Sequence, residues 1–183
     1  MQTMSSTMPM QTPQDLFIHE LSDTLSAEQI IVEMLGQAQG MVQNPQLRQG
    51  LQKHQQESQE QAQRVQQVIQ MTGQQPHPVT CHAAQGLMQS LMDVVQSGPS
   101  PEVLEGAVVA GAIKTEHLEI AGYTGLIEKA QAMGQSEAAQ LLQQNLQQEQ
   151  AMLQQLQGIS QQLTQQMASM AMAQDGSSAS ATL

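Results

Sequence analysis

The sequence predicts an all-α fold, an antiparallel four-helix bundle, on the strength of three observations. The 183 residues include one Phe, one Tyr and no Trp, which argues against a sheet-rich protein because strands favour aromatic and β-branched residues. Apolar residues recur every three or four positions along four long segments, as on the buried face of a helix. Pro, Gly and capping residues bound each of these segments.

The first two helices are expected at about 13–42 and 45–72. The run Thr12-Pro13-Gln14-Asp15 supplies a hydroxyl N-cap, a proline at the first helical position and an acid in the first turn. Asn44-Pro45 ends the first helix, because a residue before proline disfavours the helical conformation, and Gly73 ends the second. The link between the two helices is very short, so they should form an antiparallel hairpin.

A loop with two prolines and a shorter helix at about 80–97 come next. Ser100-Pro101-Glu102 repeats the start signal, and a third long helix should run to about Met133. A fourth should run from Ser136 through at least 163 and as far as 171. Two hairpins joined by a long crossover that carries a short extra helix form the connectivity of a ferritin-like four-helix bundle. The alternative is an irregular all-α domain.

The ends of the chain differ in composition from the predicted bundle. The first dozen residues are rich in Met, Ser, Thr and Gln without a helical period, and the last dozen are rich in Ser, Gly and Ala. We therefore expect a flexible N-terminal tail at 1–12, the bundle domain at 13–171 and a flexible C-terminal tail at 172–183.

Charge and composition narrow the classes of partner. The formal net charge is -11, from 16 acids and 5 Lys or Arg, which argues against a nucleic-acid partner or an anionic membrane surface. The one cysteine, Cys81, excludes an intrachain disulfide and a Cys-rich metal site. No signal peptide or apolar run long enough to span a membrane is evident, so we expect a cytoplasmic protein with no membrane partner.

Each long helix carries a potential metal ligand on its apolar stripe. In the first helix, for example, Glu28 lies between Leu25 and Val32 at helical spacing. The fourth helix has a similarly placed Glu, the third has two that share one face, and the second has a His followed one turn later by a Glu. The candidate metal ligands are Glu28, His54, Glu57, Glu116, Glu119 and Glu149.

These positions should lie at matching heights in the bundle. At about 1.5 Å per residue, Glu28 and Glu57 both lie roughly 20 Å from the first hairpin turn, and Glu119 and Glu149 lie roughly 20 Å from the second. Burying several unpaired carboxylates costs several kcal/mol each, and the few basic residues do not follow these stripes. Two divalent metal ions, iron or manganese, are the natural compensation for carboxylate and imidazole ligands.

Simpler interpretations stand beside this one. Any single Glu on such a stripe is compatible with a bundle rim, with its carboxylate in solvent, and His54 alone would fit an ordinary core or surface histidine. His117 points about 100° away from Glu116, so it lies either beside the metal ligands or on the surface, with ligation the less favoured option. Tyr123, one turn past Glu119, is either a hydrogen-bond donor to a ligand or a packing residue.

Four segments carry a family resemblance. LFIHELSDTLSAEQII from Leu16, HQQES from His54, TEHLEIAGY from Thr115 and EAAQLLQQNLQQEQ from Glu137 are similar to the YciE/YciF-type ferritin-like proteins. The resemblance covers about 15–160. It implies a ferritin-like bundle with a dinuclear metal site, usually assigned as di-iron, in dimeric bacterial stress proteins. The matching ligand positions are the six candidates above.

The ligand pattern departs from that of common di-iron bundles, which carry Glu-x-x-His on two helices. Here the second helix has the order His-x-x-Glu, and Glu149 is followed by Met152 where a His would stand. The surface is also unusual, since Gln accounts for 39 of the residues.

Two functions are therefore expected from the sequence. The first is a dinuclear metal protein that acts on dioxygen or hydrogen peroxide in stress protection, as an oxidase, a peroxidase or a catalase-like enzyme. The second is a metal-stabilised structural protein that self-associates through its Gln-rich surface without catalysis. An acidic adaptor without metal would leave the carboxylates on the apolar stripes unexplained. In either case we expect a homodimer or a larger homo-oligomer.

Overall fold

The computed structural model describes residues 10–180, which form five helices and no strand. The predicted boundaries agree with the observed ones to within about two residues, except at the end of the last helix. The elements are α1 (Pro13–Met41), α2 (Pro45–Met71), α3 (His82–Gln96), α4 (Pro101–Ala132) and α5 (Ser136–Ser180).

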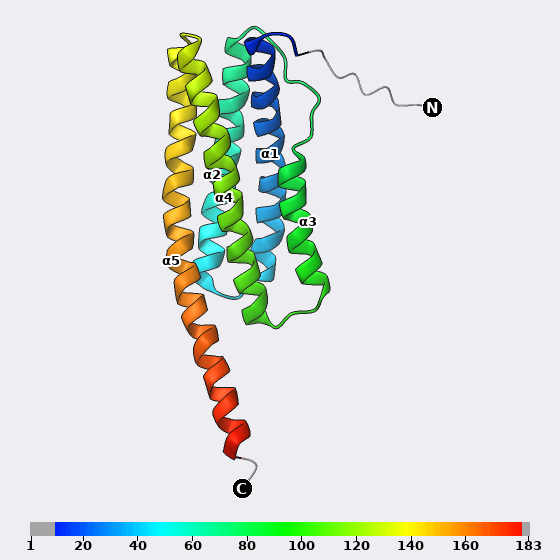
Figure 1. The fold of residues 1–183 in the computed structure, drawn as a ribbon, viewed down its shortest axis with the longest axis vertical. Coiled ribbons are helices and arrows are strands. Elements are labelled where there is room, and N and C mark those ends of the chain that lie inside the picture. The colour runs from blue at the N-terminus through cyan, green and yellow to red at the C-terminus, as the bar shows by residue number, and fades with distance from the viewer. Residues whose placement is uncertain (1–9, 181–183) are drawn as a thin grey trace, which may run out of the picture.

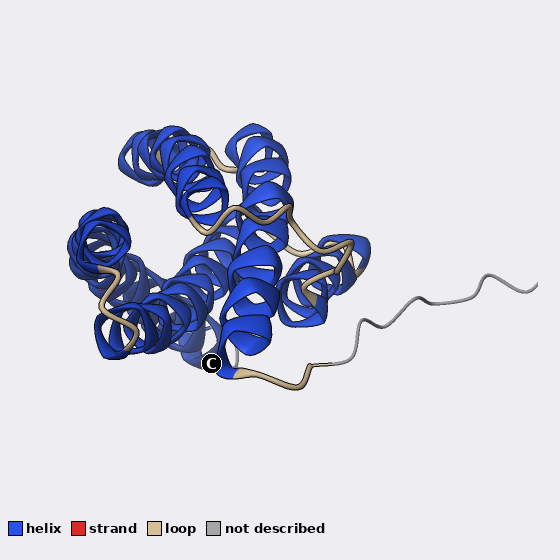
Figure 2. Cartoon of the chain, turned by 90° about the horizontal axis from the view of Figure 1, so that it is seen from above, coloured by secondary structure: helices blue, strands red, loops and turns tan. Residues whose placement is uncertain are grey.

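The two predicted hairpins are present and pack side by side. α1 packs against α2 and α4 against α5, while α2–α5 and α1–α4 contacts close the bundle. Seen from its end, the bundle has a fifth helix outside the other four (Figure 2). That helix is α3, which packs on α1 and α4 and lies beside the lower half of α1 (Figure 1). The ferritin-like connectivity is confirmed.

The helix starts use the capping residues expected from the sequence. The Thr12 side chain accepts a hydrogen bond from the backbone N–H of Asp15, at 3.1 Å, and the Asp15 carboxylate accepts one from the N–H of Thr12, at 2.9 Å. The side chains of Asn44 and Ser100 likewise accept hydrogen bonds from backbone N–H groups in the first turns of α2 and α4. These contacts satisfy N–H groups that have no partner within the helix.

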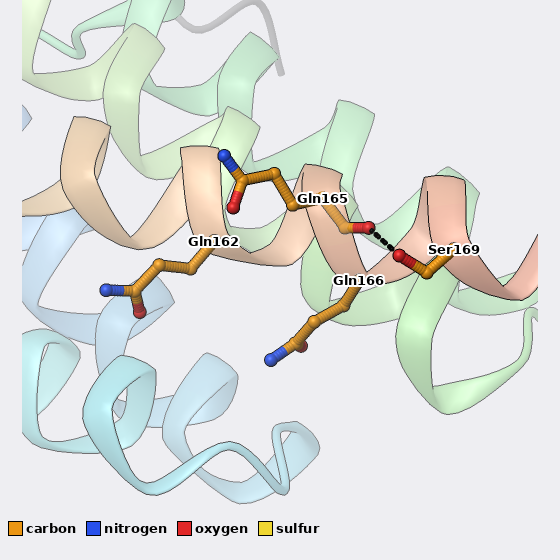
Figure 3. Close-up of a pocket in the computed structure, with 4 residues that line it drawn as sticks. All are labelled: Gln162, Gln165, Gln166 and Ser169. Atoms are coloured by element: carbon orange, nitrogen blue, oxygen red, sulfur yellow. Dashed lines mark hydrogen bonds between the residues drawn. The ribbon is translucent and has the colours of Figure 1, made fainter.

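The last helix is longer than expected. α5 continues beyond Ala171 to Ser180, so it occupies most of the segment expected to be a C-terminal tail. Figure 1 shows it extending past the ends of the other helices. Before that point, an exposed face of α5 at 162–169 carries three glutamines and Ser169 (Figure 3). Most of the expected N-terminal tail, residues 1–9, lies outside the described residues.

The core consists of two apolar clusters. The Phe17 cluster lies near the α4–α5 turn, and its members are Phe17, Ile18, Leu21, Leu25, Val65, Val68, Ile69, Tyr123, Leu126, Ile127, Ala130, Ala138, Ala139, Leu142 and Leu146. The Leu35 cluster lies near the α1–α2 turn and includes Ile31, Leu35, Leu47, Leu51, Leu91, Val108, Met152 and Leu156.

Buried polar side chains separate the two clusters at mid-bundle. We call this set the polar layer, and its members are Glu28, His54, Ser58, Gln61, Glu116, Glu119, Asn145 and Glu149. Every one of these residues is at most 4% exposed. The predicted convergence of polar groups near mid-bundle is therefore observed.

Polar contacts hold the elements around this layer. Lys129 of α4 pairs with Glu20 of α1 at 2.9 Å. The Glu105 carboxylate accepts hydrogen bonds from the backbone N–H groups of Gln43 and Asn44, which tie the α1–α2 turn to α4. In the described part of the chain, no helix combines the length and the apolar character that crossing a membrane requires.

Candidate metal centre

Four side chains from three helices meet in the polar layer. His54 comes from α2, Glu116 and Glu119 from α4, and Glu149 from α5, and one ligand atom of each lies within 4.8 Å of the other three. The i,i+3 spacing places Glu116 and Glu119 on one face of α4. The structure thus brings together four of the six predicted ligands.

His54 lies against all three carboxylates. Its Nδ1 is 3.0 Å from Oε1 of Glu116, and its Nε2 is 3.6 Å from Glu119 Oε2 and 3.7 Å from Glu149 Oε2. Neither ring nitrogen has a hydrogen-bond partner, so these short approaches lack hydrogen-bond geometry. An imidazole and three carboxylates in such contact form a group that could hold a metal ion.

Glu28 extends the group from α1. Its side chain is fully buried, and one carboxylate oxygen accepts a hydrogen bond from the hydroxyl of Tyr123. Its other oxygen has no partner, and Glu119 is close enough to affect its ionisation. Of the two alternatives for Tyr123, the structure shows the hydrogen-bond donor, although the ring also packs in the Phe17 cluster.

Glu57 and His117 lie further out. Glu57 pairs with Lys53 at 2.9 Å, and its side chain is 16% exposed, which places it at the edge of the layer. Its Oε2 is nevertheless buried without a partner. His117 is exposed on α4, because consecutive residues of a helix point about 100° apart and Glu116 faces the core.

Most of these buried polar atoms lack partners. At least one carboxylate oxygen of each of the five glutamates, and both nitrogens of His54, form no hydrogen bond. Buried polar atoms are almost always paired, and each exception calls for an explanation. A bound cation would satisfy these atoms together, so the residues present fit a metal centre.

The pKa shifts of the polar layer also fit a metal centre. Burial raises the pKa of Glu28, Glu116 and Glu119 well above the ordinary range, and the neighbouring carboxylates raise it further. Burial likewise lowers the pKa of His54. Without a cation, this site disfavours charge on Glu28, Glu116, Glu119 and His54. Carboxylates and neutral imidazole, the forms that bind metal, become favourable when a cation is present.

Sequence reasoning missed part of the surrounding network. Arg64 was not expected near the stripes, yet its guanidinium donates hydrogen bonds to Asn145 and Gln148 of α5. Asn145 also donates to the backbone carbonyl of Gln61 at 3.3 Å. One local signal for this network is Asn145, a polar residue one turn before Glu149 on the same apolar stripe. These contacts fix α2 against α5 next to the centre.

Comparisons with known proteins agree with this architecture. The chain matches the family described as Domain of unknown function (DUF892) over residues 12–169. It is 36% identical to Protein YciF of Escherichia coli over 145 residues, which cover 79% of this chain and 87% of that protein.

Solved structures show the same fold. The E. coli stress protein YciF matches with a TM-score of 0.82 at 33% identity, covering 85% of this chain and 99% of that one. YcfI from Rhodopseudomonas palustris matches with a TM-score of 0.79 at 36% identity, covering 82% and 96%. A Xanthomonas campestris protein at 20% identity, with a TM-score of 0.68 over 88% and 99%, shares the fold. The chain therefore belongs to the DUF892 family of YciF-type proteins.

Proposed function

We propose that the polar layer binds two divalent metal ions, iron or manganese, and that the loaded protein acts on dioxygen or hydrogen peroxide in stress protection. The observation that carries the proposal is the set of buried, unpaired oxygens and nitrogens from three helices around one point, with an unpaired oxygen of Glu28 on the fourth helix, α1. Glu28 of α1 and Glu57 of α2, on the two helices of the first hairpin, would complete a ligand set of six.

The chain's own residues have separable roles in this proposal. His54, Glu116, Glu119 and Glu149 would hold the metal ions, and the Tyr123 hydroxyl holds the Glu28 carboxylate in one orientation. The two apolar clusters above and below the layer exclude bulk water from it. Iron or manganese would supply electron transfer to oxygen species, a chemistry that no side chain in the layer can supply alone.

The relatives support the stress context without fixing the chemistry. YciF of E. coli is described as a stress protein. YcfI is described as a candidate structural protein, and this description favours our second hypothesis, a metal-stabilised protein that self-associates without catalysis. Such association would depend on an exposed surface like the Gln-rich face of α5 at 162–169 (Figure 3). For both functions we expect a cytoplasmic homodimer or larger homo-oligomer.

Metal analysis tests the proposal directly. Protein purified without chelator should contain about two iron or manganese ions per chain, as dinuclear bundles do, and Glu116→Ala should lose them. Glu128→Ala, an exposed position on the same helix, is the matched control and should keep them. Metal-free wild-type protein whose stability does not respond to added Fe(II) or Mn(II) would contradict the proposal. Peroxide consumption by the loaded wild type then separates the enzymatic function from the structural one.

A further inference from the structure

A small pocket reaches the polar layer from the side of the bundle, between α1, α4 and the residue that precedes α3. Its volume is about 50 Å³. Glu28 and Glu119 form part of its wall, and both have buried oxygens without a partner. Thr24 and Gly122 also line it, the first half-buried and the second exposed. The pocket thus connects the molecular surface with two carboxylates of the centre.

We propose that this pocket is the route by which a small ligand, of the size of dioxygen or hydrogen peroxide, reaches the metal centre, with Gly122 and Thr24 setting its size limit. The proposal rests on the function proposed above for the centre. It adds the path, the residues that shape it and the class of molecule that it admits.

The crossover segment gives the pocket a fixed wall. The Ser22 hydroxyl accepts a hydrogen bond from the backbone N–H of His77 at 2.9 Å, and the Ser26 hydroxyl accepts one from that of Cys81 at 3.1 Å. Both serines belong to α1, so the chain is held against that helix just before α3 begins. Beyond this point α3 covers the groove between α1 and α4 with buried side chains such as Leu91.

The size of the pocket selects its occupant. A single water needs roughly 10–15 Å³ of such space, so about 50 Å³ holds roughly three to five waters. Dioxygen and hydrogen peroxide have two heavy atoms and fit within that space. An organic substrate of ordinary size does not fit, because binding pockets for such molecules start at about 300 Å³.

Gly122 offers a way to close the route without disturbing the fold. A Cβ added there would lie 3.9 Å from the Oγ1 of Thr24, an ordinary van der Waals distance. Gly122→Ala therefore fits, and Gly122→Leu extends into the space at the pocket. Gly158 of α5 is exposed and has nothing within 4 Å of its added Cβ. The same substitutions there are matched controls for the higher helix propensity of Ala and Leu.

The first test needs no metal. Cys81 lines the pocket and is the only cysteine, so oxidation of its thiol by hydrogen peroxide in the metal-free protein, followed by mass spectrometry of the Cys81 peptide, reports on this one site. Burial raises the pKa of its thiol, so the comparison is between variants at one pH. Gly122→Leu should slow oxidation of Cys81 by about tenfold or more, whereas Gly158→Leu should not, and Thr24→Ala should speed it. Equal oxidation rates in all variants would overturn the route.

The second test follows a ligand to the metal. Nitric oxide, a diatomic probe, is mixed with Fe(II)-loaded protein, and its association is followed by stopped-flow absorbance. Gly122→Leu should slow association by about tenfold or more at unchanged iron content, while Gly158→Leu matches the wild type. An unchanged rate of nitric oxide association in Gly122→Leu overturns the proposed route but leaves the proposed function standing. Wild-type protein that binds no iron, or whose iron binds no nitric oxide, overturns the proposed function and the route together.

Discussion

The two apolar clusters and the polar layer between them are equally buried, yet their chemistry is opposite. Apart from the Tyr123 hydroxyl and the Cys81 thiol, the side chains of the Phe17 and Leu35 clusters have no polar group to satisfy, so burial stabilises the fold directly. The polar layer buries four glutamates and a histidine with most of their polar atoms unpaired, which costs several kcal/mol per charged group. The clusters therefore stabilise the fold, while the layer destabilises the metal-free protein, as expected if the layer is kept for the proposed metal binding.

The largest expected difference between these regions is how much each makes the stability of the metal-free protein depend on pH. The clusters should contribute almost nothing to this dependence, and the polar layer should dominate it. Glu28, Glu116 and Glu119 have raised pKa values in the fold. Their contribution to stability is full below the unfolded value of about 4.5 and is lost as the pH rises above it, by up to about 1.4 kcal/mol per pH unit for each group. Urea unfolding of EDTA-treated protein should show stability falling from pH 5 to pH 8.

His54 acts in the opposite direction in this experiment. Its pKa is lowered, so its contribution is present above about 6.5 and is lost as the pH falls, but three carboxyl groups outweigh one imidazole. Added Fe(II) or Mn(II) should reverse the trend, because metal binding requires deprotonated ligands. Metal-free protein that becomes more stable between pH 5 and pH 8 would contradict the unpaired burial of these carboxyls.

Truncation of a cluster residue should have the next largest effect, and it should not depend on metal. Leu21 of the Phe17 cluster is fully buried, and Leu21→Ala should cost about 2–5 kcal/mol of unfolding free energy in metal-free and metal-loaded protein alike. Leu16→Ala, at a position 40% exposed on the same helix, is the control and should cost much less. A Leu21→Ala cost that appears only with metal bound would mean that the clusters and the layer are not separate regions.

Replacing a glutamate of the polar layer by an apolar residue should raise the unfolding free energy of the metal-free protein, whereas Leu21→Ala lowers it. Glu119→Leu removes a 4%-exposed carboxylate with no hydrogen-bond partner. It should stabilise the metal-free protein by about 1–4 kcal/mol, as replacement of buried charged groups by apolar ones does elsewhere, while abolishing metal binding. Glu128→Leu, exposed on the same helix, should change stability by no more than about 0.5 kcal/mol. Thermal unfolding with and without metal measures both effects, and a destabilised metal-free Glu119→Leu protein would contradict the comparison.

The sequence predicted the regular features of the molecule better than the particular ones. Helix boundaries follow from local signals such as Asn44-Pro45, and the heights of Glu28 and Glu149 follow from a constant rise per residue. The reach of Arg64 across to α5 depends on side-chain conformation, and the pocket beside Gly122 depends on how three elements pack. No local pattern encodes either of these. The extra length of α5 was missed because its Ser/Gly-rich composition resembles that of a tail.

The smallest expected effect concerns a buried glutamate outside the polar layer. Glu105 is 8% exposed, but its Oε1 accepts hydrogen bonds from the backbone N–H groups of Gln43, at 2.7 Å, and Asn44, at 2.6 Å. Glu105→Ala should cost about 1–3 kcal/mol, because it leaves two N–H groups of the α1–α2 turn without this acceptor. Glu105→Gln, which keeps an oxygen acceptor, should recover part of that loss. Metal content should be unchanged in both variants, since Glu105 lies outside the ligand set.

Comparing Glu105→Ala with Glu119→Leu tests whether hydrogen-bond partners decide if a buried carboxylate stabilises or destabilises the fold. Both residues belong to α4 and both are buried, so burial and helix position cannot explain opposite signs of the stability change. Hydrogen-bond partners can, because Glu105 has two backbone donors and Glu119 has none. If chemical denaturation shows Glu105→Ala and Glu119→Leu changing the stability of metal-free protein in the same direction, pairing is not the deciding factor. Opposite signs would mean that Glu119 is maintained at its position for binding rather than for folding.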